Sequence, residues 1–200
     1  MRSDYLNPAL YNALYSAMTY DNVLALRVSL ETGLRIDDVL SLRYEQLKGR
    51  TITGTAMKTG KKYRKSLSAD LANRLRGLCP DKTGYFFPHR LKSGEHRTRQ
   101  AVWSNMKKAA RRFGVEVNAC PHSARKTYGV EVFKDKGFDA AQKELQHDRI
   151  DTTMIYVFSD MVNKLHQSNK QSFDFDGFAE IIAEKVVEKL KNPLEKEGLN

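Results

Sequence analysis

The chain has 200 residues, of which 40% are hydrophobic and 29% charged, and a formal net charge of +10 at pH 7. This length suits one domain with or without an appendage, and the composition excludes an intrinsically disordered chain. The sequence has no long uncharged apolar run and no signal-peptide pattern, and Cys79 and Cys120 have no metal-ligand spacing. We therefore expect a reduced, cytoplasmic protein that does not enter a membrane.

The charge is unevenly distributed along the chain. Residues 171–200 contain seven acidic residues and four lysines, a net charge of −3, which leaves +13 for residues 1–170. A basic body suits nucleic acid, and an acidic tail suits a contact with protein. Because many basic domains bind no DNA, charge alone leaves both interpretations open.

The first 50 residues have helical patterns. Asn7-Pro8 is typical of a helix start, with Asn as the N-cap and Pro at the first helical position. Asp21 is expected to cap a second, strongly apolar helix that ends at Gly33. A third helix is expected within residues 34–43.

Arg35 stands at the head of this third helix, one turn before Asp38. In a structural role, Arg35 would form an ion pair with Asp38. In a functional role, the guanidinium would bind an anion while Asp38 holds it in place. The local sequence favours the structural role.

Residues 51–67 change to a strand-like period. The segments 51–57 and 63–67 favour strands, and the turn 58–62 joins them into a hairpin with a basic tip. A single lysine on a tip is usually a solvated charge, whereas several suggest a hairpin that contacts phosphates.

The middle of the chain combines a core segment with a basic one. Ser68 is expected to cap a helix that reaches Leu78, and the apolar residues 85–88 are expected to be core. A basic loop over residues 89–99 then leads into a helix that Thr98 opens and Gly114 ends. Its outward basic face indicates contact with a DNA groove or backbone, with a solvated face as the alternative.

A third group of polar residues follows Pro121. His122 and Arg125 share one helix face, and His147 and Tyr156 follow after a break near Gly137 and a short helix over residues 138–145. Arginine offers a forked donor to phosphate, histidine a proton donor or acceptor, and tyrosine an oxygen nucleophile. Each of these residues alone is more often structural.

The end of the chain is polar over residues 167–174, which indicates a linker. Residues 177–190 then form a helical pattern with one apolar stripe made of Phe178, Ile181, Ile182, Val186 and Leu190. Such a stripe must be buried, either on its own domain or on a neighbouring molecule.

Taken in order, these motifs make the chain resemble the tyrosine recombinases, or phage integrase family. Residues 32–43 look like the first arginine box of that family, Lys58-Thr59-Gly60-Lys61 like its hairpin lysine, and Pro121–Arg125 with Leu145–Tyr156 like its second box. The resemblance covers about residues 6–165. Two positions depart mildly, since Asp38 stands where Glu is frequent and Gln146 where Gly is frequent.

The resemblance implies a mainly α fold with a small antiparallel β-sheet or hairpin, and a site-specific recombinase that cuts and rejoins DNA through a covalent 3′-phosphotyrosine. The implied catalytic residues are Arg35, Lys58, His122, Arg125, His147 and Tyr156. Asp38 is implied as an accessory residue that orients the arginine or histidine, and neither a metal ion nor a cofactor is required. The residues expected to bind DNA are Lys61, Lys62, Arg64, Arg97, Arg99, Lys107, Lys108 and Lys126.

The resemblance also implies a domain organisation and partners. Residues 1–170 would form the catalytic domain, and residues 171–200 a linker and C-terminal helix that packs on a neighbouring protomer or on its own domain. The partners would be double-stranded DNA with a specific site and further copies of the chain, from dimer to tetramer, in a bacterial, archaeal or phage-encoded system. A type IB topoisomerase and a non-catalytic DNA-binding regulator of the same fold are the alternatives.

Overall fold

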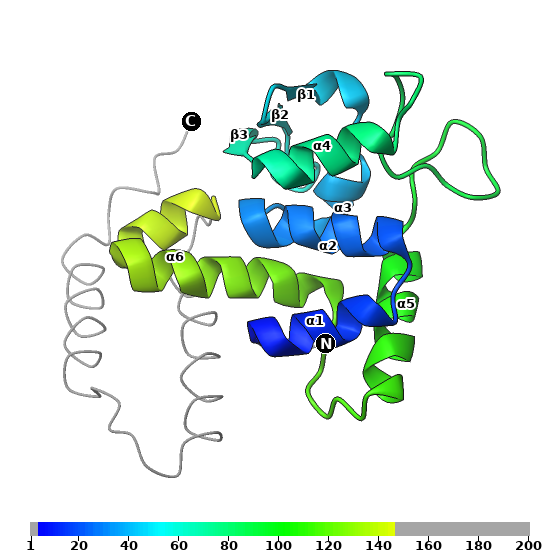
Figure 1. The fold of residues 1–200 in the computed structure, drawn as a ribbon. Helices are drawn as coiled ribbons and strands as arrows, with labels where there is room; N and C mark the ends of the chain where they lie inside the picture. The colour runs from blue at the N-terminus through cyan, green and yellow to red at the C-terminus, as the bar shows by residue number, and fades with distance from the viewer. Residues whose placement is uncertain (1–3, 147–200) are drawn as a thin grey trace, which may run out of the picture. The chain divides into compact units, whose positions relative to one another are not determined.

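The computed structural model describes residues 4–146, which form a mainly helical unit with one small antiparallel sheet (Figure 1). These residues belong to the first of two units, and the boundary between the units falls in the sequence after residue 163. The elements are α1 (Pro8–Ser16), α2 (Tyr20–Thr32), α3 (Ile36–Leu40), η1 (Tyr44–Gln46), β1 (Leu47–Lys48), β2 (Thr51–Thr55), β3 (Lys62–Ser66), α4 (Ala69–Gly77), α5 (Arg99–Arg112) and α6 (Pro121–Glu144). The predicted fold class is confirmed, whereas the linker and helix predicted within residues 167–190 lie outside the described residues.

Local capping explains where several helices begin. The side chains of Asn7, Ser68 and Thr98 accept a hydrogen bond from the backbone of the first turn of α1, α4 and α5, as predicted. The predicted cap at Asp21 is wrong, because α2 begins at Tyr20 and its N-cap is Thr19, two residues before Asp21. The Asp21 carboxylate instead accepts a hydrogen bond from Arg97 at 2.8 Å, so a distant contact replaces the local cap.

The sheet has the order β1-β2-β3, with both pairs antiparallel. β2 and β3 pair from Thr51–Ser66 to Thr55–Lys62 and form the predicted hairpin. β1 was not predicted as a separate strand, and its two residues pair only with the base of β2, at Ile52 and Thr51. The half of the hairpin that carries the turn therefore has no third strand beside it.

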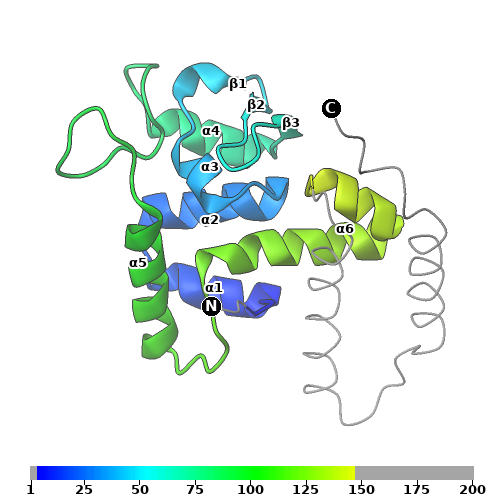
Figure 2. The same ribbon diagram turned by 180° about the vertical axis from the view of Figure 1, so that it is seen from behind.

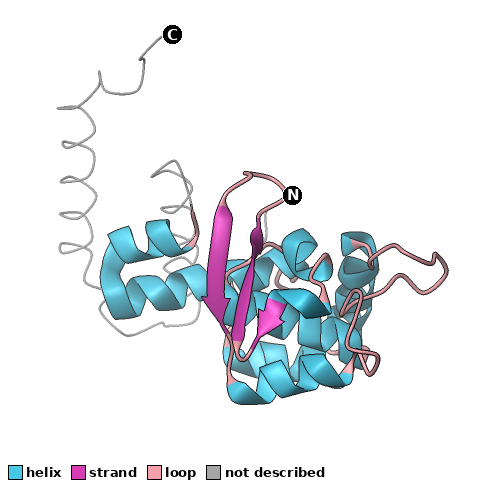
Figure 3. Cartoon of the chain, turned by 90° about the horizontal axis from the view of Figure 1, so that it is seen from above, coloured by secondary structure: helices cyan, strands magenta, loops and turns pink. Residues whose placement is uncertain are grey.

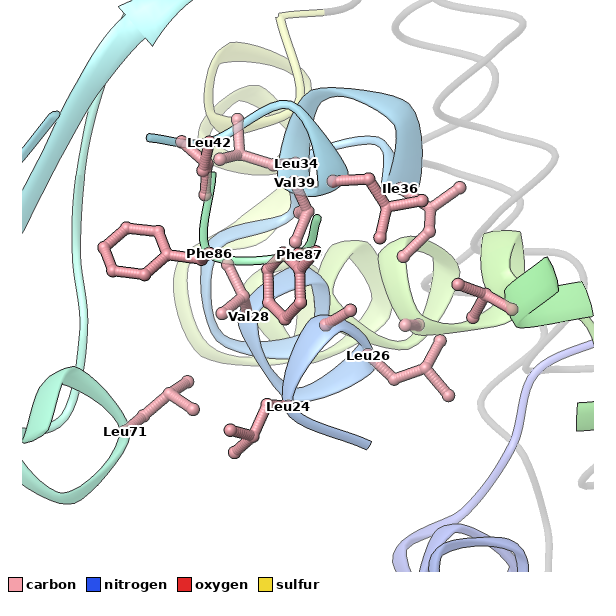
Figure 4. Packing of buried hydrophobic residues seen from close by; sticks show 14 of the residues in the cluster. Leu24, Leu26, Val28, Leu34, Ile36, Val39, Leu42, Leu71, Phe86 and Phe87 are labelled. Atoms are coloured by element: carbon pink, nitrogen blue, oxygen red, sulfur yellow. The ribbon is translucent and has the colours of Figure 1, made fainter. Parts of the chain in front are cut away.

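α2 lies at the centre of the described unit. Figures 1 and 2 show it between α6 on one side and α4 with the sheet on the other, while α5 crosses the ends of α1 and α2. The core surrounds α2, and Figure 4 shows Phe86 and Phe87 packed among its leucines and valine and residues of α3. Both phenylalanines are fully buried, which confirms the prediction that this segment is core.

α6 is two helical segments joined at a sharp kink. Gly137 has φ 80° and ψ −176°, which no helix allows, so the break predicted near this residue is confirmed. After the kink the chain turns back, and Figure 3 shows this last segment beside the strands of the hairpin. The end of α6 is thereby next to β3, although about 80 residues separate them in the sequence.

Candidate active site

The turn between α2 and α3 places Arg35. Gly33 ends α2 in the left-handed region (φ 70°), and the Ser29 hydroxyl donates a hydrogen bond to the Leu34 carbonyl at 2.7 Å. Arg35 follows as the N-cap residue of α3, with its side chain half-buried. These two constraints, on the backbone of Gly33 and Leu34, fix the position from which the Arg35 side chain extends.

Asp38 is almost completely buried, with 2% of its surface exposed. Its Oδ1 accepts a hydrogen bond from the backbone N–H of Met57 at 2.7 Å. The charge of Asp38 also contributes, after burial, to raising the pKa of Tyr63 on β3 to about 12. Among the described residues, no ion pair joins Asp38 to Arg35, so the aspartate acts on the hairpin next to Lys58.

Lys58 is exposed in the turn between β2 and β3. Two backbone hydrogen bonds close this turn, from the Ala56 N–H to the Lys61 carbonyl at 2.9 Å and from the Gly60 N–H to the Ala56 carbonyl at 2.8 Å. Gly60 supplies the positive φ of 66° that the turn needs. The ammonium is therefore carried on an ordered turn, with Asp38 holding the residue before it.

His122 lies in the first turn of α6, after Pro121 at the first helical position. Its pKa is lowered to about 4, first because surrounding protein displaces water from the imidazole and then because of cationic neighbours. These neighbours, in order of effect, are Arg125, Lys126, Arg35 and Lys58. Four cations from α3, the hairpin and α6 thus act on one imidazole that keeps contact with solvent.

Arg125 is buried within α6, with 4% of its surface exposed. Its guanidinium donates to the Gly33 carbonyl and to the Leu145 carbonyl, each at 2.5 Å. It thereby joins the turn before Arg35 to the last described residues before His147. A guanidinium fixed by two backbone acceptors has a set orientation for any anion that the site binds.

The structure thus brings together four of the six predicted catalytic residues: Arg35, Lys58, His122 and Arg125. The other two, His147 and Tyr156, lie outside the described residues. The last described residue is Gln146, directly before His147, and it has φ 52°. This left-handed conformation is one that glycine adopts without strain, which gives a physical reason for glycine to be frequent at this position.

Five of the eight cations predicted to bind DNA lie at two places, the hairpin and the neighbourhood of α5. On the hairpin, Lys62 and Arg64 are exposed and Lys61 is half-buried; near α5, Lys108 is exposed, as is Arg99, whose NH1 is 3.5 Å from Asp37 Oδ2. Lys108 also lines a hollow of about 410 Å³ between the loop 89–98 and α5. These five side chains keep their predicted role as candidates for phosphate contacts.

The other three cations differ from the prediction. Arg97 is 6% exposed and donates to Asn22 Oδ1 and Asp21 Oδ2, both at 2.8 Å, so it joins its loop to α2. Lys126 is 3% exposed inside α6, and the half-buried Lys107 donates to Asn118 Oδ1 at 2.6 Å. Burial or these protein contacts make Arg97, Lys107 and Lys126 poorer candidates for direct DNA contact than the five cations above.

Contacts between the hairpin and the end of α6 had no signal in the sequence. The Lys65 ammonium binds Glu144, and the Gln146 amide donates to the Lys62 carbonyl at 2.9 Å. Next to them is a hollow of about 320 Å³ lined by Lys61, Asp139, Gln142, Lys143 and Gln146. The partners are so far apart in the sequence that no local pattern could have paired them.

A mainly helical unit in which two arginines and a hairpin lysine act on one histidine has the architecture of a tyrosine recombinase catalytic domain. The model of the phage integrase family matches residues 4–162. The chain therefore belongs to the phage integrase family.

Individual relatives agree with this assignment. The tyrosine recombinase XerD of Lacticaseibacillus casei is 31% identical over 138 residues, which cover 63% of this chain and 46% of the relative. The chain spans about half the length of the curated relatives it matches.

Solved structures show the same fold. The XerH site-specific recombinase in a post-cleavage complex with a palindromic difH substrate has a TM-score of 0.62 at 18% identity, covering 83% of this chain and 53% of XerH. A lambda integrase dimer bound to a COC′ core site has a TM-score of 0.65 at 15% identity, covering 88% of this chain and 52% of the integrase.

Residues 4–146 contain neither a candidate metal centre nor a candidate membrane span. No cluster of three His, Cys, Asp or Glu side chains in this range could hold a metal ion. None of the helices described there is both long enough and apolar enough to cross a membrane.

Proposed function

We propose that this chain cuts and rejoins DNA at a specific site by metal-independent transesterification, as a recombinase or integrase. The observation that carries the proposal is the convergence of Arg35, Lys58 and Arg125 on His122 in a member of the phage integrase family. Three cations from three distant segments around an uncharged imidazole form a site for an anion that reacts, and a DNA phosphodiester is such an anion.

In the proposed reaction, the Tyr156 hydroxyl oxygen attacks the phosphorus and forms the new P–O bond, while the bond from phosphorus to the 5′ oxygen breaks. The leaving 5′ oxygen keeps the electron pair and takes a proton from the Lys58 ammonium. Attack of a 5′ hydroxyl on the phosphotyrosine reverses these changes. No external energy source is required, because the tyrosine ester conserves the bond energy.

The other residues serve the transition state. Arg35 and Arg125 offer guanidinium donors to the non-bridging oxygens, where negative charge increases as the tyrosine attacks. His122 is neutral at pH 7, because its pKa is about 4, and a neutral imidazole can accept the proton that Tyr156 loses. His147 would donate a hydrogen bond to a phosphate oxygen, and Asp38 would act through the hairpin rather than on the phosphate.

The experiment that tests this function is covalent trapping. The chain should form an adduct with nicked DNA in which the cleaved end diffuses away, and Tyr156→Phe should abolish the adduct, because Phe lacks the attacking oxygen. A control variant, Tyr20→Phe, changes an exposed tyrosine and should leave trapping unchanged. An adduct that persists in Tyr156→Phe would rule out Tyr156 as the nucleophile.

The same adduct identifies the substrate. Sequencing the DNA attached to the wild-type chain should return one recurrent site for a recombinase. Sites without a common sequence, together with relaxation of any supercoiled plasmid, would instead identify a topoisomerase. Absence of any adduct would identify a DNA-binding regulator.

The proposed partners are double-stranded DNA and further copies of the chain. The XerH and lambda integrase neighbours are both bound to DNA, and the integrase is a dimer. The acidic tail with its apolar stripe would join protomers on DNA, as a segment distinct from a catalytic domain that ends near residue 170. A cytoplasmic location, where the DNA is, stays a prediction from the sequence.

A further inference from the structure

β3 is attached to the end of α6 by a group of partly buried polar contacts. The Lys65 ammonium, on a side chain 11% exposed, donates to the Glu144 carbonyl at 2.9 Å and also binds the Glu144 carboxylate. The Tyr128 hydroxyl donates to the same carboxylate at 3.0 Å, and the ammonium lies 5.4 Å from the centre of the Tyr128 ring. Hydrogen bonds to charged groups are the stronger kind, and the Lys65 end of this contact is largely shielded from water, so the contact holds the strand in place.

A second contact lies nearer the turn. The Gln146 side-chain amide donates to the Lys62 carbonyl at 2.9 Å, although Gln146 itself has φ 52°. A left-handed backbone strains a residue that has a Cβ. The hydrogen bond to β3 offsets part of that strain, which gives the glutamine a purpose at this position.

The hairpin needs these contacts to hold its turn in place. β1 supports only the base of β2, and a two-stranded hairpin alone is marginally stable in water. Asp38 holds the β2 side at Met57, one residue before Lys58, and Gln146 holds the β3 side at Lys62, four residues after it. The turn that carries Lys58 is therefore held by a hydrogen bond on each side.

The segment that binds β3 also binds Arg125. Leu145, between Glu144 and Gln146, gives its carbonyl to Arg125. Three consecutive residues thus alternate between the hairpin and the guanidinium, so the position of Lys58 depends on the same short segment as that of Arg125.

We propose that Glu144 and Gln146 are positioning residues that hold the Lys58 hairpin in place for protonation of the leaving 5′ oxygen. This inference rests on the proposed function. It assigns the two residues an effect on the step that needs an acid, and none on the attack by tyrosine.

The test compares two substrates made from the DNA site recovered in the covalent complex. One has the natural 5′ oxygen at the cleaved bond, and the other has sulfur in its place. An alkyl thiol ionises near pH 8.5, so the thiolate leaves without a proton from an acid. Cleavage of the sulfur substrate therefore measures everything except the contribution of Lys58 as the acid.

The main variant is Gln146→Gly, because glycine adopts φ 52° without strain and removes only the side-chain hydrogen bond. A misplacement of about 1 Å lowers rates on the order of 100-fold, so we expect cleavage of the oxygen substrate to fall roughly 10- to 100-fold. Cleavage of the sulfur substrate should stay within about threefold of wild type, because no proton is needed. Glu144→Gln should act in the same direction.

The chain contains a matched control. On the same helix, Glu131 Oε1 accepts from the Tyr5 hydroxyl at 3.3 Å and from the Lys134 ammonium at 3.0 Å, and that ammonium lies 5.5 Å from the Tyr5 ring. Glu131→Gln removes an equivalent carboxylate from an equivalent Tyr–Glu–Lys group away from the hairpin. It should leave cleavage of both substrates unchanged.

Equal losses on both substrates in Gln146→Gly would overturn the inference, and so would full activity on the oxygen substrate. Hydrogen exchange of the Ala56 and Gly60 amides, which close the turn, separates this inference from the proposed function. Exchange should become roughly tenfold faster in Gln146→Gly than in wild type, with or without DNA cleavage. A wild-type chain that cuts neither substrate would refute the proposed function, whereas unchanged exchange in Gln146→Gly would refute the positioning role of Gln146.

Discussion

At the scale of single residues, His122 shows how the site responds to charge. Loss of water around the imidazole and, after it, the charges of four nearby cations lower its pKa from the ordinary value of 6.5 to about 4. A phosphodiester that binds there adds negative charge and shifts this pKa upward. His122 is therefore neutral in the free protein and becomes a better base when DNA is present.

This leads to a prediction about pH. Between pH 6.5 and pH 4 the unfolded chain binds more protons at His122 than the folded chain does, so stability decreases as pH falls through this range. His122→Gln removes that proton uptake and should reduce the loss of melting temperature between pH 7 and pH 5 by on the order of 1–3 °C. NMR titration of the His122 ring gives the direct measurement, and a pKa of 6.5 or higher without DNA would contradict the prediction.

Residue types were predictable at this scale, but their surroundings were not. Arg35, Lys58, His122 and Arg125 were selected from the sequence because they form, with His147 and Tyr156, an ordered set that resembles the motifs of the family. Arg97 was selected only for its positive charge within a basic segment, and it proved to be buried against Asp21 and Asn22, 76 and 75 residues away. Whether a basic side chain faces solvent or protein depends on such distant partners.

At the scale of elements, the packing of α2 against α6 supports the site. The Tyr128 ring of α6 lies directly over Gly33 at the end of α2, where a Cβ would be 2.4 Å from the ring. Gly33 also has φ 70° and gives its carbonyl to Arg125. Because Gly33 has no side chain, it can end α2, contact the Tyr128 ring and bind Arg125 through its carbonyl at the same time.

Gly33→Ala should destabilise the chain by about 2–4 kcal/mol, since it adds a steric clash to the strain of a left-handed alanine. Chemical denaturation measures this loss. Gly49→Ala is the matched control, because Gly49 has φ 59° and open space around its Cα, so only the strain of about 1 kcal/mol applies. Equal losses in the two variants would show that the ring contact has no effect.

Most elements were predictable because they depend on local chemistry. Asn7, Ser68, Thr98 and Gly33 act on their own helix ends, and each was identified correctly. β1 was missed because two residues have no alternating pattern. The Asp21 cap was wrong because Arg97 binds that carboxylate, while the Thr19 hydroxyl donates to Asn105 at 3.2 Å.

At the scale of the whole molecule, the acidic tail, residues 171–200, has no role in the proposed reaction. Its apolar stripe, from Phe178 to Leu190, lies outside the described residues and stays a prediction of the sequence. Deleting residues 172–200 should weaken assembly of several copies on DNA but spare cleavage of a nicked substrate, which needs one copy. Band shifts and covalent trapping measure the two effects.

Point changes provide the control for this deletion. Replacing Ile181 and Ile182 with serine keeps the length and charge of the tail but removes part of the apolar stripe, and should weaken assembly as the deletion does. Replacing Glu195 and Glu197 with glutamine, beyond the stripe, should have little effect. Assembly that is unchanged by the deletion would refute a role for the tail.

The two backbone bonds of Arg125 reach carbonyls 92 residues before it and 20 residues after it. Before α2 and α6 have docked, these segments are independent, and the cations are dispersed along a flexible polymer. A nascent or partly denatured chain would consequently lack any assembled centre. For the DNA cleavage proposed above, this arrangement is a safeguard, because the guanidinium of Arg125 takes its place only once folding is complete.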